Sequence, residues 1–235
     1  MVIAAIKNGF QILGFSDHAF IPSYINPSGQ DLYMSPSEFE KNYKNEIILC
    51  QNKYPNIKLY IGLETEYVSE AKEYYEMLRK KVDYLVLGAH FFYSKNKNNK
   101  SVSYNTYFDI TSENCHLYAL AVKEALDTKL FSILAHPDLY MRSIDEWNEN
   151  TWCAATIIIE AAIKNGVYLE INLGGGYAYP HIDFWRLVKK YNYHKILIGY
   201  DAHSPSDLEP SRLHHVAPIL DLMKGLIVDS MEEFK

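Results

Sequence analysis

The sequence predicts an α/β barrel of parallel strands, and two patterns along the chain support this fold class. Short apolar runs alternate with longer amphipathic stretches over the 235 residues. The apolar residues of each run are nearly continuous, which is typical of a strand that is buried on both faces. Strands that alternate with helices are expected to run parallel, because each helix carries the chain back across the sheet.

The positions of the strands and helices follow from these patterns. Strands are expected at residues 11–15, 57–63, 84–88, 131–135, 167–171 and 195–199. Helices are expected at residues 2–7, 35–53, 70–81, 112–128, 151–165, 182–191 and 206–223. A chain of repeated strand–helix units normally begins with a strand, whereas this sequence begins with a helix and the strand that follows it.

Two of the helix boundaries carry recognisable signals. Ser35 and Pro36 with Glu38 form the pattern of a capping box at a helix start. Asn165-Gly166 is a helix stop that precedes a strand. The segment 93–105 is rich in Asn, Lys and Ser, and we interpret it as a mobile, solvated loop in preference to a lid over a substrate.

The bulk composition limits the class of protein. The length and the 48% of hydrophobic residues fit one globular domain, expected to span residues 1–235. A net charge of −6 without a dense basic tract argues against a nucleic-acid partner. Three scattered cysteines, no apolar run of about 20 residues and no signal peptide predict a cytoplasmic protein with reduced thiols and no membrane partner.

Ionisable residues follow five of the six expected strands, directly at the carboxyl end of each strand. These residues lie in Ser16-Asp17-His18, at Glu64, at His90, in His136-Pro137-Asp138 and in Asp201-Ala202-His203. Parallel strands bring their carboxyl ends to one face, where the active sites of α/β proteins form. One such residue would be explained by capping, but five of them predict a shared site.

The residue types in this set indicate metal chemistry. Imidazole and carboxylate ligands together suit Zn²⁺, Mn²⁺ or Fe, and the absence of cysteine from the set argues against a closed structural zinc site. A carboxylate such as Glu64 can bridge two ions, which fits phosphate-ester hydrolysis by two or more metals. The ions would polarise the phosphoryl oxygens and lower the pKa of a bound water.

Further candidates lie in the loops of the same face. Arg142 follows the His136 segment, and its guanidinium could bind a phosphate or form an ordinary salt bridge. Gly174-Gly175-Gly176 could let backbone amides approach an anion, although a flexible turn is the better interpretation. Structural or surface roles are expected for the remaining histidines, which are His116, His181, His194, His214 and His215.

These motifs, in this order, resemble a known family. Ser16-Asp17-His18, Gly62-Leu63-Glu64, Gly88-Ala89-His90, Ala135-His136-Pro137-Asp138 and Asp201-Ala202-His203-Ser204 are similar to the ordered motifs of the PHP (polymerase and histidinol phosphatase) metal-dependent phosphoesterases. The resemblance covers about residues 10 to 210 and is greatest to the histidinol-phosphate phosphatase branch.

The resemblance implies a fold and a role for each motif residue. The fold would be a distorted (βα)7 TIM-like barrel of the PHP type with two or three divalent metal ions. Glu64 would bridge two metals and Asp201 would help to hold the first. The second metal would be completed by His90 and His136, and the third would be bound by His18 and His203. Asp17 would orient His18 or move a proton.

The sequence departs from the family at its start. The family begins with a strand that carries a His-x-His motif, and no equivalent is present, so the barrel is expected to lack its first strand and to have an open edge. An N-terminally truncated chain and a divergent member with a reduced site are the two explanations, of which we favour the first. The second metal site is expected to be the best retained.

Hydrolysis of a small phosphomonoester is the predicted activity, and the resemblance points to L-histidinol phosphate as the substrate. The catalytic candidates are Asp17 and Arg142, and Arg142 is also the candidate for substrate binding. Alternatives are another PHP activity, such as a phosphotyrosine phosphatase or a nuclease, and an inactive truncated protein that still binds metal. The metal (Zn, Mn or Fe) and the oligomeric state, with a homodimer among the options, stay open.

Overall fold

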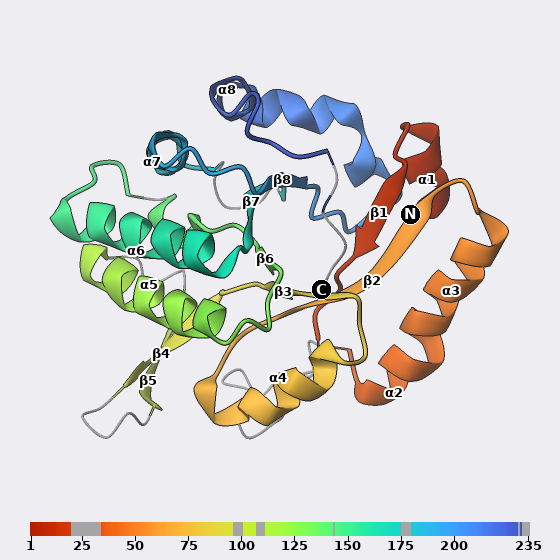
Figure 1. Cartoon of the computed structure of the whole chain (residues 1–235), viewed down its shortest axis with the longest axis horizontal. Coiled ribbons are helices and arrows are strands. Elements are labelled where there is room, and N and C mark those ends of the chain that lie inside the picture. The colour runs from red at the N-terminus through yellow and green to blue at the C-terminus, as the bar shows by residue number, and fades with distance from the viewer. Residues whose placement is uncertain are drawn as a thin grey trace.

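A curled sheet of parallel strands forms the centre of the computed structural model (Figure 1). The structure describes residues 1–19, 34–95, 101–106, 111–142, 144–174, 180–229 and 231. The strands of this sheet are β1 (Ile12–Phe15), β2 (Lys58–Thr65), β3 (Tyr84–Leu87), β6 (Ile133–Leu134), β7 (Tyr168–Asn172) and β8 (Ile196–Gly199). They lie in the order β1-β2-β3-β6-β7-β8, and every neighbouring pair is parallel. The predicted strand–helix alternation in a parallel sheet is therefore confirmed.

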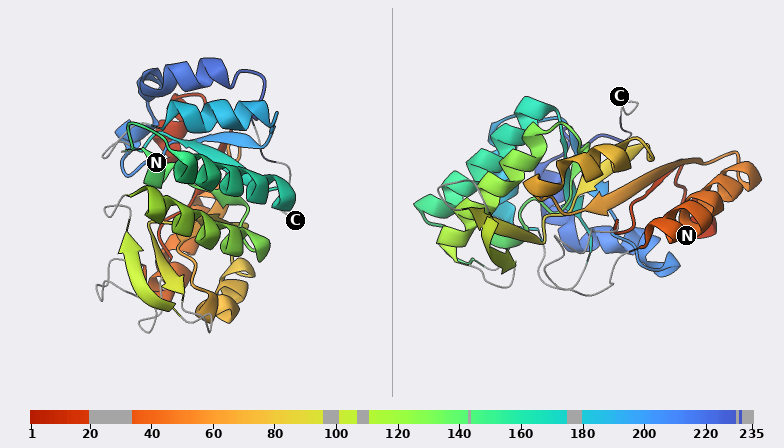
Figure 2. Two further views of the ribbon diagram at one scale, coloured as in Figure 1. Left: turned by 90° about the vertical axis from the view of Figure 1, so that its left-hand side faces the viewer. Right: turned by 90° about the horizontal axis from the view of Figure 1, so that it is seen from below.

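Helices lie on the outside of the curled sheet (Figures 1 and 2). They are α1 (Val2–Lys7), α2 (Pro36–Glu38), α3 (Lys44–Lys53), α4 (Lys72–Arg79), α5 (Ser112–Asp127), α6 (Glu149–Asn165), α7 (Ile182–Lys190) and α8 (Ala217–Leu222). Both predicted boundary signals are confirmed. The Ser35 hydroxyl accepts the Glu38 amide at 3.2 Å while the Glu38 carboxylate accepts the Ser35 amide at 2.8 Å. Gly166 ends α6 in the left-handed conformation, with φ of 67°.

Alternate residues of each strand face opposite sides of the sheet, and both sides are buried in the central strands β3 and β6. Leu63, Leu85 and Leu87 pack outward with the helices in the main core. Tyr84 and Val86 face inward and join a second cluster with Ile133, Ala135 and Tyr168. This two-sided burial explains why the sequences of the central strands are continuously apolar.

A segment at the end of the chain closes the inner cluster. The Val228 amide donates to the Ile196 carbonyl at 2.8 Å, next to a parallel bridge between Ile196 and Ile227. Val228 and Met231 pack against the inward-facing cluster. Because β8 begins at Ile196, this segment covers the amino ends of the strands, and the opposite end of the sheet is the one that carries the polar residues.

Four details of the predicted elements are wrong. Segment 93–105 was expected to be a loop, but β4 (Phe91–Lys95) and β5 (Ser101–Thr106) pair as an antiparallel hairpin. Residues 96–100 lie outside the described residues. Hairpin pairing satisfies backbone groups whatever the side chains are, and the buried side chains of Phe91 and Phe92 attach its first strand to the core.

The other errors concern one helix and the ends of two strands. The helix expected at 206–223 is instead two 3₁₀ segments, Pro205–Leu208 and Pro210–Val216, followed by α8. A proline opens each 3₁₀ segment and interrupts the helical hydrogen bonds. The strand expected at 131–135 is only Ile133–Leu134. β2 runs to Thr65, two residues beyond its expected end, because Glu64 and Thr65 pair with Val86 and Leu87 of β3.

The helices in the described part of the chain are all too short or too polar to cross a membrane.

The Tyr84 ring packs inside the barrel and leaves room only for glycine at two neighbouring positions. Its hydroxyl donates to the Phe15 carbonyl at 2.8 Å, and its ring occupies the space where a methyl group on Gly14 or Gly62 would lie. We therefore expect Gly62→Ala to lower the free energy of unfolding by about 1–3 kcal/mol through overpacking. Urea unfolding followed by circular dichroism measures this change.

The same substitution in a Tyr84→Leu background is the control. The smaller side chain leaves room for the methyl group, so the cost of Gly62→Ala should fall by at least half. Equal costs in the two backgrounds would show that the Tyr84 ring is not the obstacle.

Candidate metal centre

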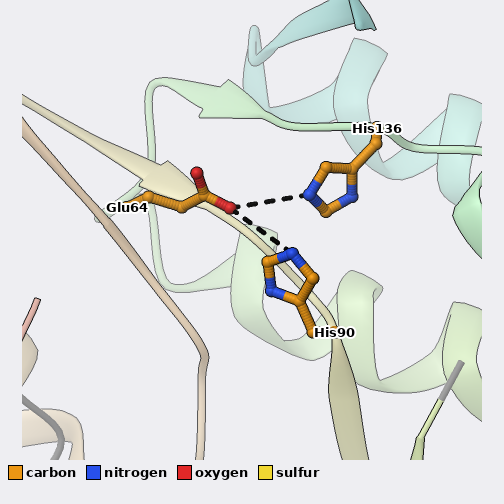
Figure 3. Close-up of side chains that lie close together, drawn as sticks. All are labelled: Glu64, His90 and His136. Atoms are coloured by element: carbon orange, nitrogen blue, oxygen red, sulfur yellow. Dashed lines mark ion pairs between the residues drawn. The ribbon is translucent and has the colours of Figure 1, made fainter. Parts of the chain in front are cut away.

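Glu64, His90 and His136 converge at the carboxyl ends of three neighbouring strands (Figure 3). Glu64 Oε1 lies 3.8 Å from His90 Nε2 and 3.5 Å from His136 Nε2. One ligand atom from each residue lies within 4.8 Å of the other two, and this is the arrangement among the described residues that could hold a metal ion. Three residues that the sequence predicted to share a site are thus brought together from β2, from the end of β3 and from the end of β6.

The segment after β1 continues alongside β2 and brings two more of the predicted residues to this end. The Glu64 amide donates to the Asp17 carbonyl at 3.0 Å, and the Ala19 amide donates to the Glu64 carbonyl at 2.7 Å. The ring centroid of His18 lies 5.7 Å from that of His90. The side chains of Asp17 and His18 are both exposed, so they border the three central residues from the solvent side.

The segment after β8 contributes Asp201 and His203. Asp201 Oδ2 accepts from Asn172 Nδ2 at 3.4 Å, and the negative charge of Asp201 raises the pKa of His90. The His203 side chain is 80% exposed, and its Nδ1 lies 3.0 Å from the Asp201 carbonyl oxygen. His203 therefore lies at the rim of the site, near Asp17, whose pKa burial raises and the charges of His18 and His203 lower only in part.

The electrostatics of the three central residues favour binding of a cation. Burial raises the pKa of Glu64, but the hydrogen bond from His136 and the charges of His90, His136 and His18 outweigh it and bring the pKa to about 2. Burial lowers the pKa of His136 below its usual range. Glu64 is therefore an anion and His136 a neutral imidazole at neutral pH, which are the states that bind a metal.

His90 differs from His136 in its protonation. Burial lowers the pKa of His90, but the charge and hydrogen bond of Glu66, with the charges of Glu64 and Asp201, raise it to about 9. Without a metal ion, His90 therefore carries a proton at neutral pH. A metal ion that binds at Nε2 must displace this proton.

Two carboxylates near the central residues were missed by the sequence reasoning. Glu66 Oε1 lies 2.8 Å from His90 Nδ1. Glu170 Oε2 accepts the His136 amide at 3.0 Å and Asn172 Nδ2 at 2.9 Å. The sequence held a signal for each of them. Glu170 is a glutamate at an inward-facing position of a largely apolar strand, and Glu66 is the second glutamate of the Glu-Thr-Glu segment after Leu63.

Glycines make room for the acidic side chains. A methyl group on Gly88 would overlap the Glu64 carboxylate, one on Gly199 would overlap Glu170, and one on Gly174 would overlap Asp201. These three glycines thus have a steric explanation, because a larger residue would displace a carboxylate from the inner face.

The backbone at two of the predicted ligands is unusual. His136 and Asp201 have positive φ angles of 31° and 45°. Residues other than glycine rarely adopt such angles, and those that do are concentrated at functional sites. The hydrogen bond from the His136 amide to Glu170 holds one of these two turns in place.

Arg142 is buried and paired with a carboxylate. Its side chain is 5% exposed, and its Nε and Nη2 lie 3.1 Å and 3.0 Å from Asp138 Oδ1. The other oxygen of Asp138 accepts the amide of His181, and the His181 ring caps α7 and stacks on Trp147. The structure thus shows a salt bridge at Arg142, and its role in phosphate binding stays a prediction.

The predicted anion-binding glycines are described only in part. The Gly174 amide donates to Asn172 Oδ1 at 2.8 Å, so this group is already occupied by a side chain. Gly175 and Gly176 lie outside the described residues.

The donor set fits the predicted metals. Two imidazole nitrogens and one carboxylate oxygen suit Zn²⁺, Mn²⁺ or Fe, and no thiol lies among these three residues. His90 also has the buried carboxylate partner that metal-binding histidines commonly have on their second nitrogen. Glu64, His90 and His136 would hold the ion.

Solved structures with the same fold are known. A protein from Listeria monocytogenes, named as a candidate histidinol phosphatase HisK, has a TM-score of 0.69 and 17% identity over 92% of each chain. The histidinol phosphate phosphatase HisK of Lactococcus lactis subsp. lactis, complexed with zinc, L-histidinol and phosphate, has a TM-score of 0.73 and 19% identity, covering 100% of this chain and 90% of that chain. At these identities the similarity establishes the fold, which is the predicted PHP barrel.

A search of curated proteins finds no match. The family model described as PHP domain matches residues 1–174, which is most of the chain and includes the segments that contain Asp17, Glu64, His90 and His136. The family predicted from the motifs is therefore confirmed, and the protein belongs to the PHP domain family.

Proposed function

We propose that this protein is a metal-dependent phosphomonoesterase and that L-histidinol phosphate is its substrate. The observation that carries the proposal is the convergence of Glu64, His90 and His136 within 4.8 Å at the carboxyl end of the barrel. Active sites of α/β barrels lie at this end. The PHP domain match and the two HisK structures support a phosphatase, while the histidinol specificity is part of the proposal.

The central residues prepare the site for an anionic ester. A bound divalent cation supplies positive charge to the phosphoryl oxygens and lowers the pKa of water. Glu64 stays ionised because its pKa is about 2, and His136 stays neutral because burial lowers its pKa. The clustered carboxylates would repel a phosphate on their own, so a substrate of this class requires the compensating charge of a cation.

The residues at the rim would complete the site. Asp201 and His18 lie next to the central residues and would extend the set of ligands toward a second or third ion. His203, at the rim, would join them there. Asp17 would move a proton, because partial burial of its carboxyl group raises its pKa. The assignment of all six ligands, of Asp17 and of Arg142 is a proposal.

The activity test uses a panel of phosphate esters. The full chain loaded with Zn²⁺ or Mn²⁺ should release phosphate from L-histidinol phosphate, and a chelator should abolish the release until metal is restored. Phosphotyrosine, p-nitrophenyl phosphate and a single-stranded oligonucleotide separate other activities of the family. Preferred hydrolysis of another ester would contradict the histidinol specificity, and metal binding without turnover of any ester would contradict the enzymatic function.

Substitution of a central residue separates metal binding from folding. We expect His136→Ala to weaken zinc binding by about 100-fold or more, because one of three central ligands is lost. Calorimetric titration of the metal-free protein measures this affinity. His194→Ala is the matched control, since His194 is exposed and lies near the amino end of β8, away from the carboxyl ends of the strands. Similar losses in the two variants would contradict the proposed site.

The proton on His90 makes zinc binding dependent on pH. Because the pKa of His90 is about 9 without metal, binding at neutral pH releases one proton. The zinc association constant should rise about tenfold per pH unit between pH 6 and 8 and level off near pH 9. Titrations in buffers of different ionisation enthalpy report the number of protons released. An association constant that does not change over this range would exclude His90 as a ligand.

A further inference from the structure

We infer that Glu66 is the positioning residue of the metal centre and that it holds His90 with Nε2 turned toward the cation. The inference rests on the proposed function only in that the site binds a divalent metal. Glu66 is not a member of the metal-binding cluster, and its carboxylate lies on the other side of the His90 ring from that cluster.

The contacts of Glu66 are concentrated on one neighbour. Its Oε1 lies 2.8 Å from His90 Nδ1, and its Oε2 accepts the His90 amide at 3.0 Å. The Phe91 amide also points at Oε2, at 3.4 Å. One carboxylate thus fixes both the ring and the backbone of His90, at the junction between β3 and the hairpin strand β4.

The burial of Glu66 shows that these contacts matter to the fold. Glu66 is only 2% exposed, and a carboxylate at such a position requires hydrogen bonds and positive charge. His90 and the two amides supply both. The hydroxyl of Tyr140 donates to the His90 carbonyl at 3.1 Å, so the backbone of His90 is held from a second side.

The geometry assigns the two nitrogens of His90 to different partners. Nδ1 donates to Glu66, while Nε2 lies on the opposite edge of the ring, 3.8 Å from Glu64 Oε1. A carboxylate on one imidazole nitrogen fixes the tautomer and the ring orientation, and it makes the other nitrogen a stronger metal ligand. Glu66 would therefore hold one nitrogen of His90 while the other nitrogen stays available to the cation.

The second histidine of the centre is held differently. His136 Nδ1 is buried and has no hydrogen-bond partner among the described residues. Glu170 accepts the His136 amide and so fixes the backbone instead of the ring. Loss of Glu66 is therefore expected to affect His90 alone, and His136 and Glu64 should keep a weaker site.

Zinc affinity tests the inference without any measurement of activity. We expect Glu66→Gln to lower the affinity of the full chain for zinc by about 10–100-fold. Glu66→Asp, which keeps the charge on a shorter side chain, should recover part of the loss. Glu73→Gln, an exposed glutamate on α4, is the matched control and should bind zinc as the unsubstituted chain does.

A spectroscopic readout separates positioning from mere stability. In the zinc-loaded protein the Nδ1 proton of His90 should give a slowly exchanging, downfield proton resonance, which Glu66→Gln should shift upfield and Glu66→Asp should partly restore. The melting temperatures of the metal-free variants show whether each one folds. If Glu66→Gln does not fold, the Asp variant and its resonance decide the question.

Three results would overturn the inference. Unchanged zinc affinity in a folded Glu66→Gln variant is the first, and an unchanged Nδ1 resonance in that variant is the second. A loss of zinc affinity in Glu73→Gln as large as that in Glu66→Gln is the third. A chain that binds zinc through His90 but hydrolyses no phosphate ester would contradict the proposed function and leave this inference standing.

Discussion

The site depends on how side chains share the inner face of a strongly curled parallel sheet. Inward positions of neighbouring strands lie close together, so a long side chain on one strand requires a small residue on the next. Gly88 leaves room for the Glu64 carboxylate, and Gly199 leaves room for Glu170. The strand register, in which Glu64 pairs with Val86, places the Glu64 side chain where His90 and His136 can reach it.

The same crowding brings several carboxylates close together, and positive charge nearby stabilises them. Burial, together with the charges of Glu64 and Asp201, outweighs the hydrogen bonds of Glu170 and raises its pKa to about 7. His90 supplies part of this positive charge, because its pKa of about 9 keeps it protonated at neutral pH. A divalent cation would replace that proton and offset more of the negative charge, which is why the arrangement suits metal binding as well as folding.

The two ends of the barrel differ in the side chains that face inward. At the amino ends of the strands, Tyr84, Tyr168 and the segment around Val228 form an apolar cluster. At the carboxyl ends, the inward positions carry acids, histidines and glycines. The apolar cluster and the candidate metal site therefore occupy different layers of the same inner face, and active sites of α/β barrels form at the carboxyl ends of the strands.

The sequence determined the architecture and the central residues, because both follow from local patterns. Continuous apolar runs separated by amphipathic stretches specify parallel strands and helices, and a histidine or carboxylate directly after such a run must lie at the active end of the sheet. Glu64, His90 and His136 were found in this way. The capping box at Ser35 and the stop at Gly166 are equally local.

Only the tertiary structure decided which other groups serve the site and how. Glu66 contacts His90, which lies 24 positions later in the chain, and Glu170 contacts His136, which lies 34 positions earlier. No local pattern encodes such contacts. The salt bridge of Arg142 with Asp138 depends on burial, which a loop sequence does not reveal. The hairpin of β4 and β5 forms from a polar segment because pairing satisfies its backbone and because Phe91 and Phe92 anchor it in the core.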